Sequence, residues 1–413
     1  MEKNYTNNLL YAIVVMIVPL FLSFHLVKGL SYSILTIGFF LIAIIICNVK
    51  DGRIIIGKFS KECMLLIVVF IFFQFISITN GYIIDGFFIT NDFFNMIGKA
   101  IMIYTFIIIP LGQSVSLKEF CEFTKRFTII SIFICLFNIF DNFNLIIHFF
   151  DISNSYQFNV TGVFANRNQF GAFMFISVVV HTYYNTIIPP CRLDCVAYAI
   201  QFSNLILSMS RGAMLATGVF LFIYWILYKK IISRYFIPFF VSLVIICVSL
   251  TNRGILDFIQ KNIIRIDVGN SGRSNVWLTG FEIANREISS LFVGQGLFHG
   301  VSIAQSSGMP FDQFHSVYID TIVSGGIIEL LFLVALFTFI ILSVAKCPNY
   351  KLKWVSLASL FGYLVLCIFE SDSVLSIGYV DMINTIMFLT IPLIISRIKN
   401  NTLTNSIYKS SPK

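Results

Sequence analysis

The sequence predicts an all-α integral membrane protein of about 12 transmembrane helices, with one long outer loop between the ninth and tenth. The first observation is composition: 57% of the 413 residues are hydrophobic and only 12% are charged. Mean hydropathy is +0.88, and so little polar surface cannot cover a soluble globule of this size. The second observation is that apolar runs of helical length recur along the chain. The third is that residues 251–315 form the one long interruption of these runs.

Each predicted span is an apolar run, because a hydrocarbon core of roughly 30 Å requires about 20 apolar residues in a helix. Twelve segments meet or approach this length: 9–27, 33–49, 63–79, 96–112, 127–140, 169–187, 194–209, 212–228, 235–250, 316–345, 353–369 and 374–396. The first run lacks a small-residue cleavage site, so we expect it to be retained as a helix and not removed as a signal peptide.

Lysine and arginine near the ends of spans set orientation, because loops that carry them stay in the cytoplasm. With the N-terminus inside, most of the 28 basic residues fall on the inner side. Both termini are then cytoplasmic. Residues 1–397 form a single membrane domain that includes the outer loop 251–315, and residues 398–413 form a short cytoplasmic tail. The net charge of +8 therefore reflects orientation and does not indicate nucleic-acid binding.

Basic residues on the outer side work against this orientation, so they are candidates for function. They are Lys28, Lys99, Arg167, Arg211, Arg253, Lys261, Arg265, Arg273 and Arg286. Arg167 lies between Asn166 and Asn168 at the start of the sixth span, where all three side chains can donate hydrogen bonds to oxygen-rich groups. The alternative is that one asparagine caps the helix, which would explain it without any ligand.

Two further arginines stand at predicted helix starts. Arg211 lies in a short turn between the seventh and eighth spans, where its planar guanidinium can grip a phosphate or reach lipid headgroups. Arg273 precedes a predicted helix that runs to about residue 289, with Ser274 as its N-cap, and exposed N–H groups at such a terminus also favour an anion. Trp277 and Phe281 recur at helical spacing, and we expect them to pack on the membrane domain.

His315 ends the outer loop and titrates near neutral pH, as a general base must. Residues 327–345 are long enough to span the membrane alone, so 316–326 is a candidate interfacial or re-entrant piece, broken at Gly325-Gly326. Charged residues within spans or at their ends are candidates by default. These are Asp320, Glu329, Glu370, Asp372 and Asp381, to which we assign neither a role, a metal nor a cofactor.

Taken together, these pieces resemble the O-antigen polymerase and O-antigen ligase superfamily of bacterial envelope enzymes. The matching residues are Gly162-x-Phe164-x-Asn166-x-Asn168-x-x-Gly171, Ser210-Arg211-Gly212, Arg273 with Trp277, Gly294-x-Gly296, and His315 followed by Tyr318 and Gly325-Gly326. The resemblance covers roughly residues 160–345. It implies a multi-pass glycosyltransferase of the bacterial inner membrane, in the synthesis of lipopolysaccharide or another surface polysaccharide, with its active site on the periplasmic side.

The resemblance also implies a donor, an oligosaccharide linked to undecaprenyl diphosphate, and metal-free inversion at the anomeric carbon. Arg211 and Arg273 would hold the leaving diphosphate, and His315 would take the proton of the acceptor hydroxyl. Arg167, Asn166, Asn168 and Trp277 are the expected substrate-binding residues. Expected partners are the bilayer, a chain-length regulator and a flippase of the same pathway.

Ligases of the family tend to carry asparagine directly after the histidine, and here the residue is Ser316. This departure and the Asn166-x-Asn168 segment favour a polymerase, which adds the chain to a new lipid-linked repeat. The alternative is a ligase, which adds the finished glycan to the lipid A core. A flippase or transporter with twelve spans is less favoured, because such proteins commonly show related halves around a central connection, and here the large loop is late and external.

Overall fold

The protein is helical in the computed structural model, which describes residues 49–50, 53–54, 61–108, 115–147, 160–162, 164, 166–228, 273–309, 312–371, 374–375 and 379–398. The first two predicted spans and the ninth lie outside these ranges, except for Val49. So do residues 251–272 of the predicted loop and nearly all of the tail. Two very short strands, β1 (Val49–Lys50) and β2 (Arg53–Ile54), pair antiparallel.

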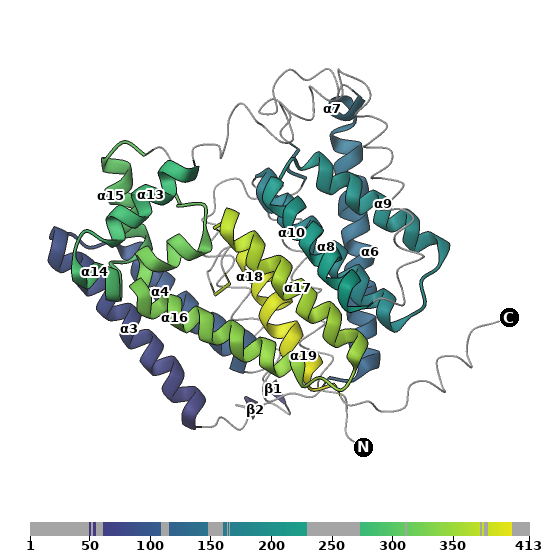
Figure 1. Cartoon of the computed structure of the whole chain (residues 1–413), viewed down its shortest axis with the longest axis horizontal. Coiled ribbons are helices and arrows are strands. Elements are labelled where there is room, and N and C mark those ends of the chain that lie inside the picture. Colours follow the sequence, from purple (N-terminus) through teal and green to yellow (C-terminus); the bar gives the residue numbers. More distant parts are fainter. Residues whose placement is uncertain are drawn as a thin grey trace.

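Helices occupy every predicted span that the structure describes (Figure 1). They are α3 (Lys61–Asp85), α4 (Thr90–Ile103) with the π-helix η1 (Tyr104–Ile108), α6 (Leu117–Asp141), α7 (Phe143–Ile147), α8 (Arg167–Ile187), α9 (Arg192–Leu207), α10 (Arg211–Leu227), α16 (Val317–Ala345), α17 (Tyr350–Phe369), α18 (Tyr379–Thr385), the π-helix η5 (Ile386–Thr390) and α19 (Ile391–Ser396). The fifth predicted span, expected to be short, is a 25-residue helix in α6.

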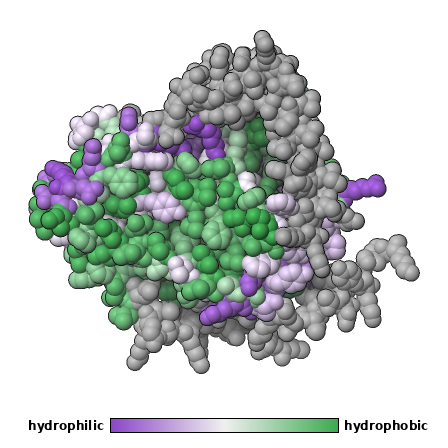
Figure 2. Space-filling view, viewed as in Figure 1, coloured by the Kyte–Doolittle hydropathy of each residue, from purple (hydrophilic) through white to green (hydrophobic). Residues whose placement is uncertain are grey.

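Five helices in the described part of the chain are long and apolar enough to cross a membrane. They are α3 over Ile67–Asp85, α6, α8, α16 and α17, while α10 and Ile383–Ser396 are apolar but shorter. Figure 2 shows hydrophobic side chains covering the middle of one face of the molecule, with hydrophilic ones gathered at its upper and left margins. Phe133 and Phe140 on α6 are 73% and 84% exposed, which suits side chains that face lipid.

Helix α8 is the centre of the bundle. It packs against α6, α9, α10 and α17, and most of its side chains are buried. Phe173 and Phe175 are both fully buried on it, and Phe175 stacks on Phe388 of η5 with ring centroids 5.6 Å apart. Because four helices pack around α8, its N-terminal residues are fixed in position relative to the ends of those helices.

The predicted loop 251–315, where it is described, is built from three short helices: α13 (Arg273–Ala284), α14 (Ile288–Val293) and α15 (Leu297–Ser306). They cluster beside the Asp85 end of α3 (Figure 1). Two details of the prediction are wrong. Helix α13 ends at Ala284 and not near residue 289, and Ser274 lies inside its first turn instead of capping it. The chain breaks after Ala284 and starts again at α14, which a single helical pattern does not reveal.

Helix α16 is interrupted at the glycine pair, as predicted. Gly325 has φ −133° and ψ 17°, and Gly326 has φ +65° and ψ −161°. A φ of +65° lies in the left-handed region, which glycine enters at no steric cost. The piece before the break docks on α17, where the Tyr318 hydroxyl donates to the Leu364 carbonyl at 3.0 Å.

The turn between α14 and α15 fills the break in α16. The carbonyl oxygens of Val323 and Ser324 accept hydrogen bonds from the backbone N–H groups of Gln295 and Gly296, at 3.1 and 3.0 Å. A Cβ on Gly294 would overlap the Ser324 carbonyl. The two glycine pairs, Gly294 with Gly296 and Gly325 with Gly326, are therefore opposite sides of one backbone contact that attaches α14 and α15 to the break in α16.

Candidate functional site

A buried carboxylate, that of Glu370, lies at the centre of the site. Glu370 follows the last residue of α17, and its side chain is 4% exposed. Arg273, the first residue of α13, donates from Nη2 to Glu370 Oε1 at 3.0 Å and is itself 16% exposed. This ion pair joins the start of α13 to the end of α17.

The N-terminus of α8 approaches the same carboxylate. The Asn168 side chain makes a hydrogen bond to Glu370, and Arg167 is close enough to interact with it electrostatically. Burial raises the pKa of the Glu370 carboxyl, while Arg273, Asn168 and Arg167 oppose that rise. Positive groups from two distant segments thus offset the desolvation of one acid.

The N-terminus of α10 also abuts Glu370. This helix starts at Arg211, and the Ser210 side chain accepts a hydrogen bond from the Ala213 N–H as its cap. A Cβ on Gly212 would lie 3.1 Å from the Phe369 Cβ and 3.3 Å from Glu370 Oε1. A side chain at this position would require Phe369 or Glu370 to move by a few tenths of an ångström. Arg211 stands directly before it, at the positive end of the helix.

His315 lies in the turn that leads into α16, near Arg273. Its φ is +55°, a left-handed conformation that is uncommon for a residue with a side chain and concentrates at functional sites. Its pKa is lowered from the ordinary value, mainly by burial and further by the Arg273 charge, while Asp312 opposes the shift. His315 is therefore held as a neutral imidazole near neutral pH. The Gln313 amide lies 3.2 Å from its Nδ1.

Four of the seven residues predicted from sequence thus come together around Glu370 or next to its partner Arg273: Arg167, Asn168, Arg273 and His315. Arg211 begins the helix whose next residue contacts Glu370. These residues come from the starts of three helices, one turn and the end of a fourth helix. The cluster carries more positive than negative charge, which suits an anionic ligand.

The other two predicted residues have different positions. Asn166 is the N-cap of α8, and its side chain accepts from the Gln169 N–H at 2.9 Å, so the capping alternative is confirmed for this residue. Trp277 is half-buried and packs against Phe369 with ring centroids 6.3 Å apart. Its indole N–H has no hydrogen-bond partner among the described residues. Phe281 is 43% exposed, so its expected packing on the membrane domain is wrong; Val276, Gly280 and Ile283 form the buried face of α13 instead.

Glu370 received no role from the sequence, although it is the residue that the others surround. The available signal was a carboxylate at the end of a strongly apolar helix, where an unpaired charge is costly. What the sequence could not supply was its partner, because Arg273 lies 97 residues away.

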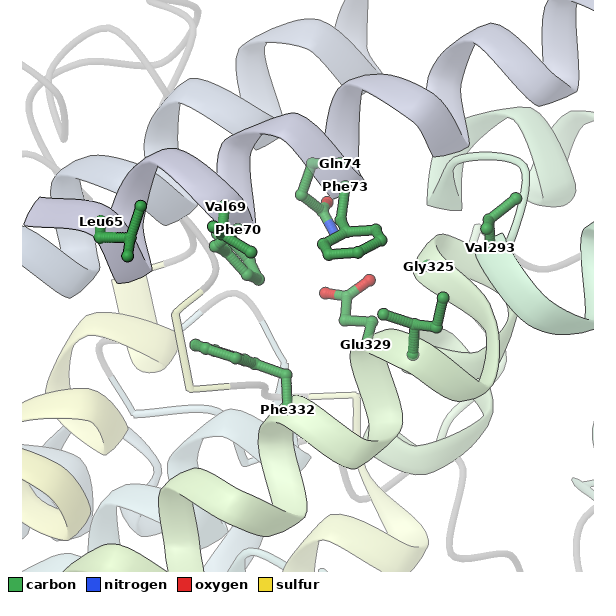
Figure 3. A pocket seen from close by; sticks show the side chains of 10 residues that line it. Leu65, Val69, Phe70, Phe73, Gln74, Val293, Gly325, Glu329 and Phe332 are labelled. Carbon is green, nitrogen blue, oxygen red and sulfur yellow. The ribbon is translucent and has the colours of Figure 1, made fainter. Parts of the chain in front are cut away.

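A second buried ion pair explains two other charges. Lys99 of α4 and Glu329 of α16 are 2.5 Å apart, and Lys99 also donates to Gln74 and to the Ser324 hydroxyl, at 3.2 and 3.0 Å. Figure 3 shows the Glu329 carboxylate directed from α16 toward Gln74 of α3, at the edge of an apolar cavity of about 350 Å³. This pair ties α3 and α4 to the second half of α16, just after its break, and is separate from the Glu370 cluster.

Part of the chain is similar to a known protein family. Residues 196–334, which run from α9 through Arg211, Arg273 and His315 into α16, match the family model described as O-Antigen ligase. No curated protein matches the chain in sequence. The match covers only part of the chain, whose described residues include five helices long and apolar enough to cross a membrane.

Proposed function

Because residues 196–334 carry an O-antigen ligase domain, we propose that this protein is a glycan polymerase of the bacterial inner membrane. It transfers a glycan from undecaprenyl diphosphate to a sugar hydroxyl of a new lipid-linked repeat unit. The observation that carries the proposal is the convergence of Arg167, Arg273 and the N-terminus of α10 on one buried carboxylate beside His315. Both termini are cytoplasmic in this proposal, and the site is on the periplasmic side.

The arginines supply what a leaving diphosphate needs. As the bond from the anomeric carbon to the diphosphate oxygen breaks, negative charge grows on the diphosphate, and fixed cations stabilise that charge without reorganising. Arg273 and Arg211 hold the diphosphate, with Arg167 and Asn168 beside them. Glu370 keeps Arg273 in place before the donor binds and prevents a cluster of uncompensated positive charges.

His315 serves as the general base. The acceptor hydroxyl attacks the anomeric carbon from the face opposite the diphosphate, and its proton passes to the imidazole, which gives inversion without a metal. The lowered pKa of His315 keeps the ring neutral and able to accept. The Gln313 amide nitrogen lies 3.2 Å from Nδ1 and donates to it, so Nδ1 accepts and Nε2 carries the ring proton in this geometry. For Nε2 to accept the proton of the acceptor hydroxyl, the Gln313 amide must turn over, so that its carbonyl oxygen accepts from a protonated Nδ1.

The second candidate is a ligase that transfers the finished glycan to the lipid A core, which the description of the matched family favours. The two reactions share donor, site and mechanism and differ in acceptor. Ser316, where ligases tend to carry asparagine, is the residue that favours the polymerase.

A deletion strain separates these functions. A polymerase deletion leaves single repeats on the lipid core, whereas a ligase deletion leaves polymer attached to its lipid carrier. Accumulation of repeat units on the cytoplasmic face would instead indicate a flippase. Arg211→Ala, Arg273→Ala and His315→Ala should each fail to restore long glycan chains to this strain while still reaching the membrane. Normal chain-length ladders in all three would refute the proposed site.

A further inference from the structure

Asp320 is a buried carboxylate that the proposed chemistry does not use. It lies in the first turn of α16 and is 6% exposed. Its Oδ1 accepts a hydrogen bond from the Phe314 N–H at 3.1 Å, and its own N–H donates to the Ser316 carbonyl at 2.9 Å. One residue therefore bonds to the neighbours of His315 on both sides.

The same turn is attached to the end of α17. The Val317 N–H donates to the Glu370 carbonyl at 3.1 Å, and the Ser316 hydroxyl lies 3.4 Å from the Cys367 carbonyl. Ser371, directly after Glu370, lines the same small cavity of about 50 Å³ as Asp320. The backbone that carries His315 is thus fixed between Asp320 and the chain segment that carries Glu370.

His315 needs such support because its own conformation is unfavourable. Left-handed backbone at a residue with a side chain persists only where the surroundings hold it. The fully buried Phe314 side chain anchors one end of the turn. The Asp320 carboxylate accepts the hydrogen bond of the buried Phe314 N–H. Without this acceptor, the turn can relax and carry the imidazole away from Arg273.

We propose that Asp320 is a positioning residue for glycan transfer: its carboxylate fixes the left-handed turn that aims His315 at the acceptor hydroxyl beside the Arg273–Glu370 pair. The inference rests on the proposed function, because it assigns to Asp320 the placement of the general base. Asp320 touches neither donor nor acceptor. Its loss should slow the chemical step and leave binding of the diphosphate intact.

Three variants separate positioning from a general need for a buried polar group. Asp320→Asn keeps an oxygen that accepts the Phe314 N–H, and Asp320→Ala removes it. Thr321→Val is the matched control, because Thr321 is the next residue, is buried, and bonds only within α16, from its hydroxyl to the Val317 carbonyl at 2.7 Å. For each purified full-length protein we would measure thermal unfolding, the affinity for farnesyl diphosphate, and kcat and KM with lipid-linked repeat units extracted from the deletion strain.

Misplacing a catalytic group by about 1 Å can cost on the order of 10²-fold in rate. We therefore expect kcat of Asp320→Ala to fall about 10²-fold, with KM and farnesyl diphosphate affinity within about twofold of the wild type. Asp320→Asn should keep kcat within about tenfold of the wild type, and Thr321→Val should match it.

The inference is overturned if Asp320→Ala turns over like the wild type. It is also overturned if farnesyl diphosphate affinity falls together with kcat, or if Asp320→Asn is as impaired as Asp320→Ala. Failure of the proposed function would give a different result. The wild-type protein itself would then neither bind farnesyl diphosphate nor extend the repeat units, whatever the variants show.

Discussion

Removing Arg273 would leave the Glu370 carboxylate buried without its cation. The two groups are 3.0 Å apart, and their side chains are 16% and 4% exposed, so water screens the pair little. Deleting one partner of a buried ion pair typically costs about 3–5 kcal/mol. Glu370 can avoid part of this cost by taking up a proton, since burial already raises its pKa. We therefore expect Arg273→Ala to lower the free energy of unfolding by about 3 kcal/mol.

The assay is a double-mutant cycle. Unfolding of the purified protein in detergent is followed for Arg273→Ala, Glu370→Gln and the double variant, and each is also tested for long glycan chains in the deletion strain. The double variant should regain most of the lost stability, because no buried charge remains uncompensated. It should still make no long chains, because the diphosphate has lost Arg273.

A matched control comes from an exposed pair. Arg126 and Glu122 are 3.9 Å apart on α6 and about half exposed, so Arg126→Ala should cost at most about 0.5 kcal/mol. If the double variant recovers glycan chains together with stability, Arg273 is structural and its role at the diphosphate is refuted. If Arg273→Ala is as stable as Arg126→Ala, the reasoning about the buried pair is wrong.

Three further predictions concern the base, the guanidinium and the break in α16. Transfer activity should fall only below about pH 6.5, because the pKa of His315 is lowered from its ordinary value. A pH–rate profile in which activity already falls above that pH would contradict the assignment of His315 as the general base. Stability should fall over the same range, because the folded protein resists protonating His315 more than the unfolded chain does. Arg273→Lys should show the same loss of activity at low pH but a much lower kcat, because lysine keeps the positive charge and lacks the planar guanidinium with its paired N–H donors. Full activity of Arg273→Lys would indicate that only the charge at this position matters. Gly326→Ala should lower the unfolding free energy by about 1–2 kcal/mol or more, because its φ is +65° and a Cβ would overlap the Phe292 carbonyl. Gly218→Ala is the control, because a Cβ there has nothing within 4 Å, and it should leave the unfolding free energy unchanged or raise it slightly. Equal unfolding free energies for the two variants would show that the left-handed backbone of Gly326 does not require glycine.

The helices were predictable because hydrophobicity and polar boundaries are local properties of the sequence. The starts of α8 and α10 fall within two residues of the predicted spans, since Asn166 and Ser210 are polar caps directly before apolar runs. The break at Gly325-Gly326 was predictable for a similar reason: residues 316–345 exceed the length that one span needs.

The convergence on Glu370 was not predictable in the same way. Nothing in the local sequence pairs it with Arg273, and the Lys99–Glu329 pair likewise joins residues from different helices. The exposure of Phe281 was missed for a related reason. Helical spacing identifies which residues share a face of a helix, but the elements that pack against the helix decide which face is buried. In α13 the buried face carries Val276, Gly280 and Ile283.

The most direct test of the account is transfer by the purified wild-type protein in vesicles that contain its undecaprenyl-diphosphate-linked repeat unit as both donor and acceptor. The account predicts glycans of two and more repeats on the lipid, with one undecaprenyl diphosphate released for each bond formed, and neither product with His315→Ala or Arg273→Ala. Repeat units that remain single and fully lipid-linked in the presence of the wild-type protein would contradict it.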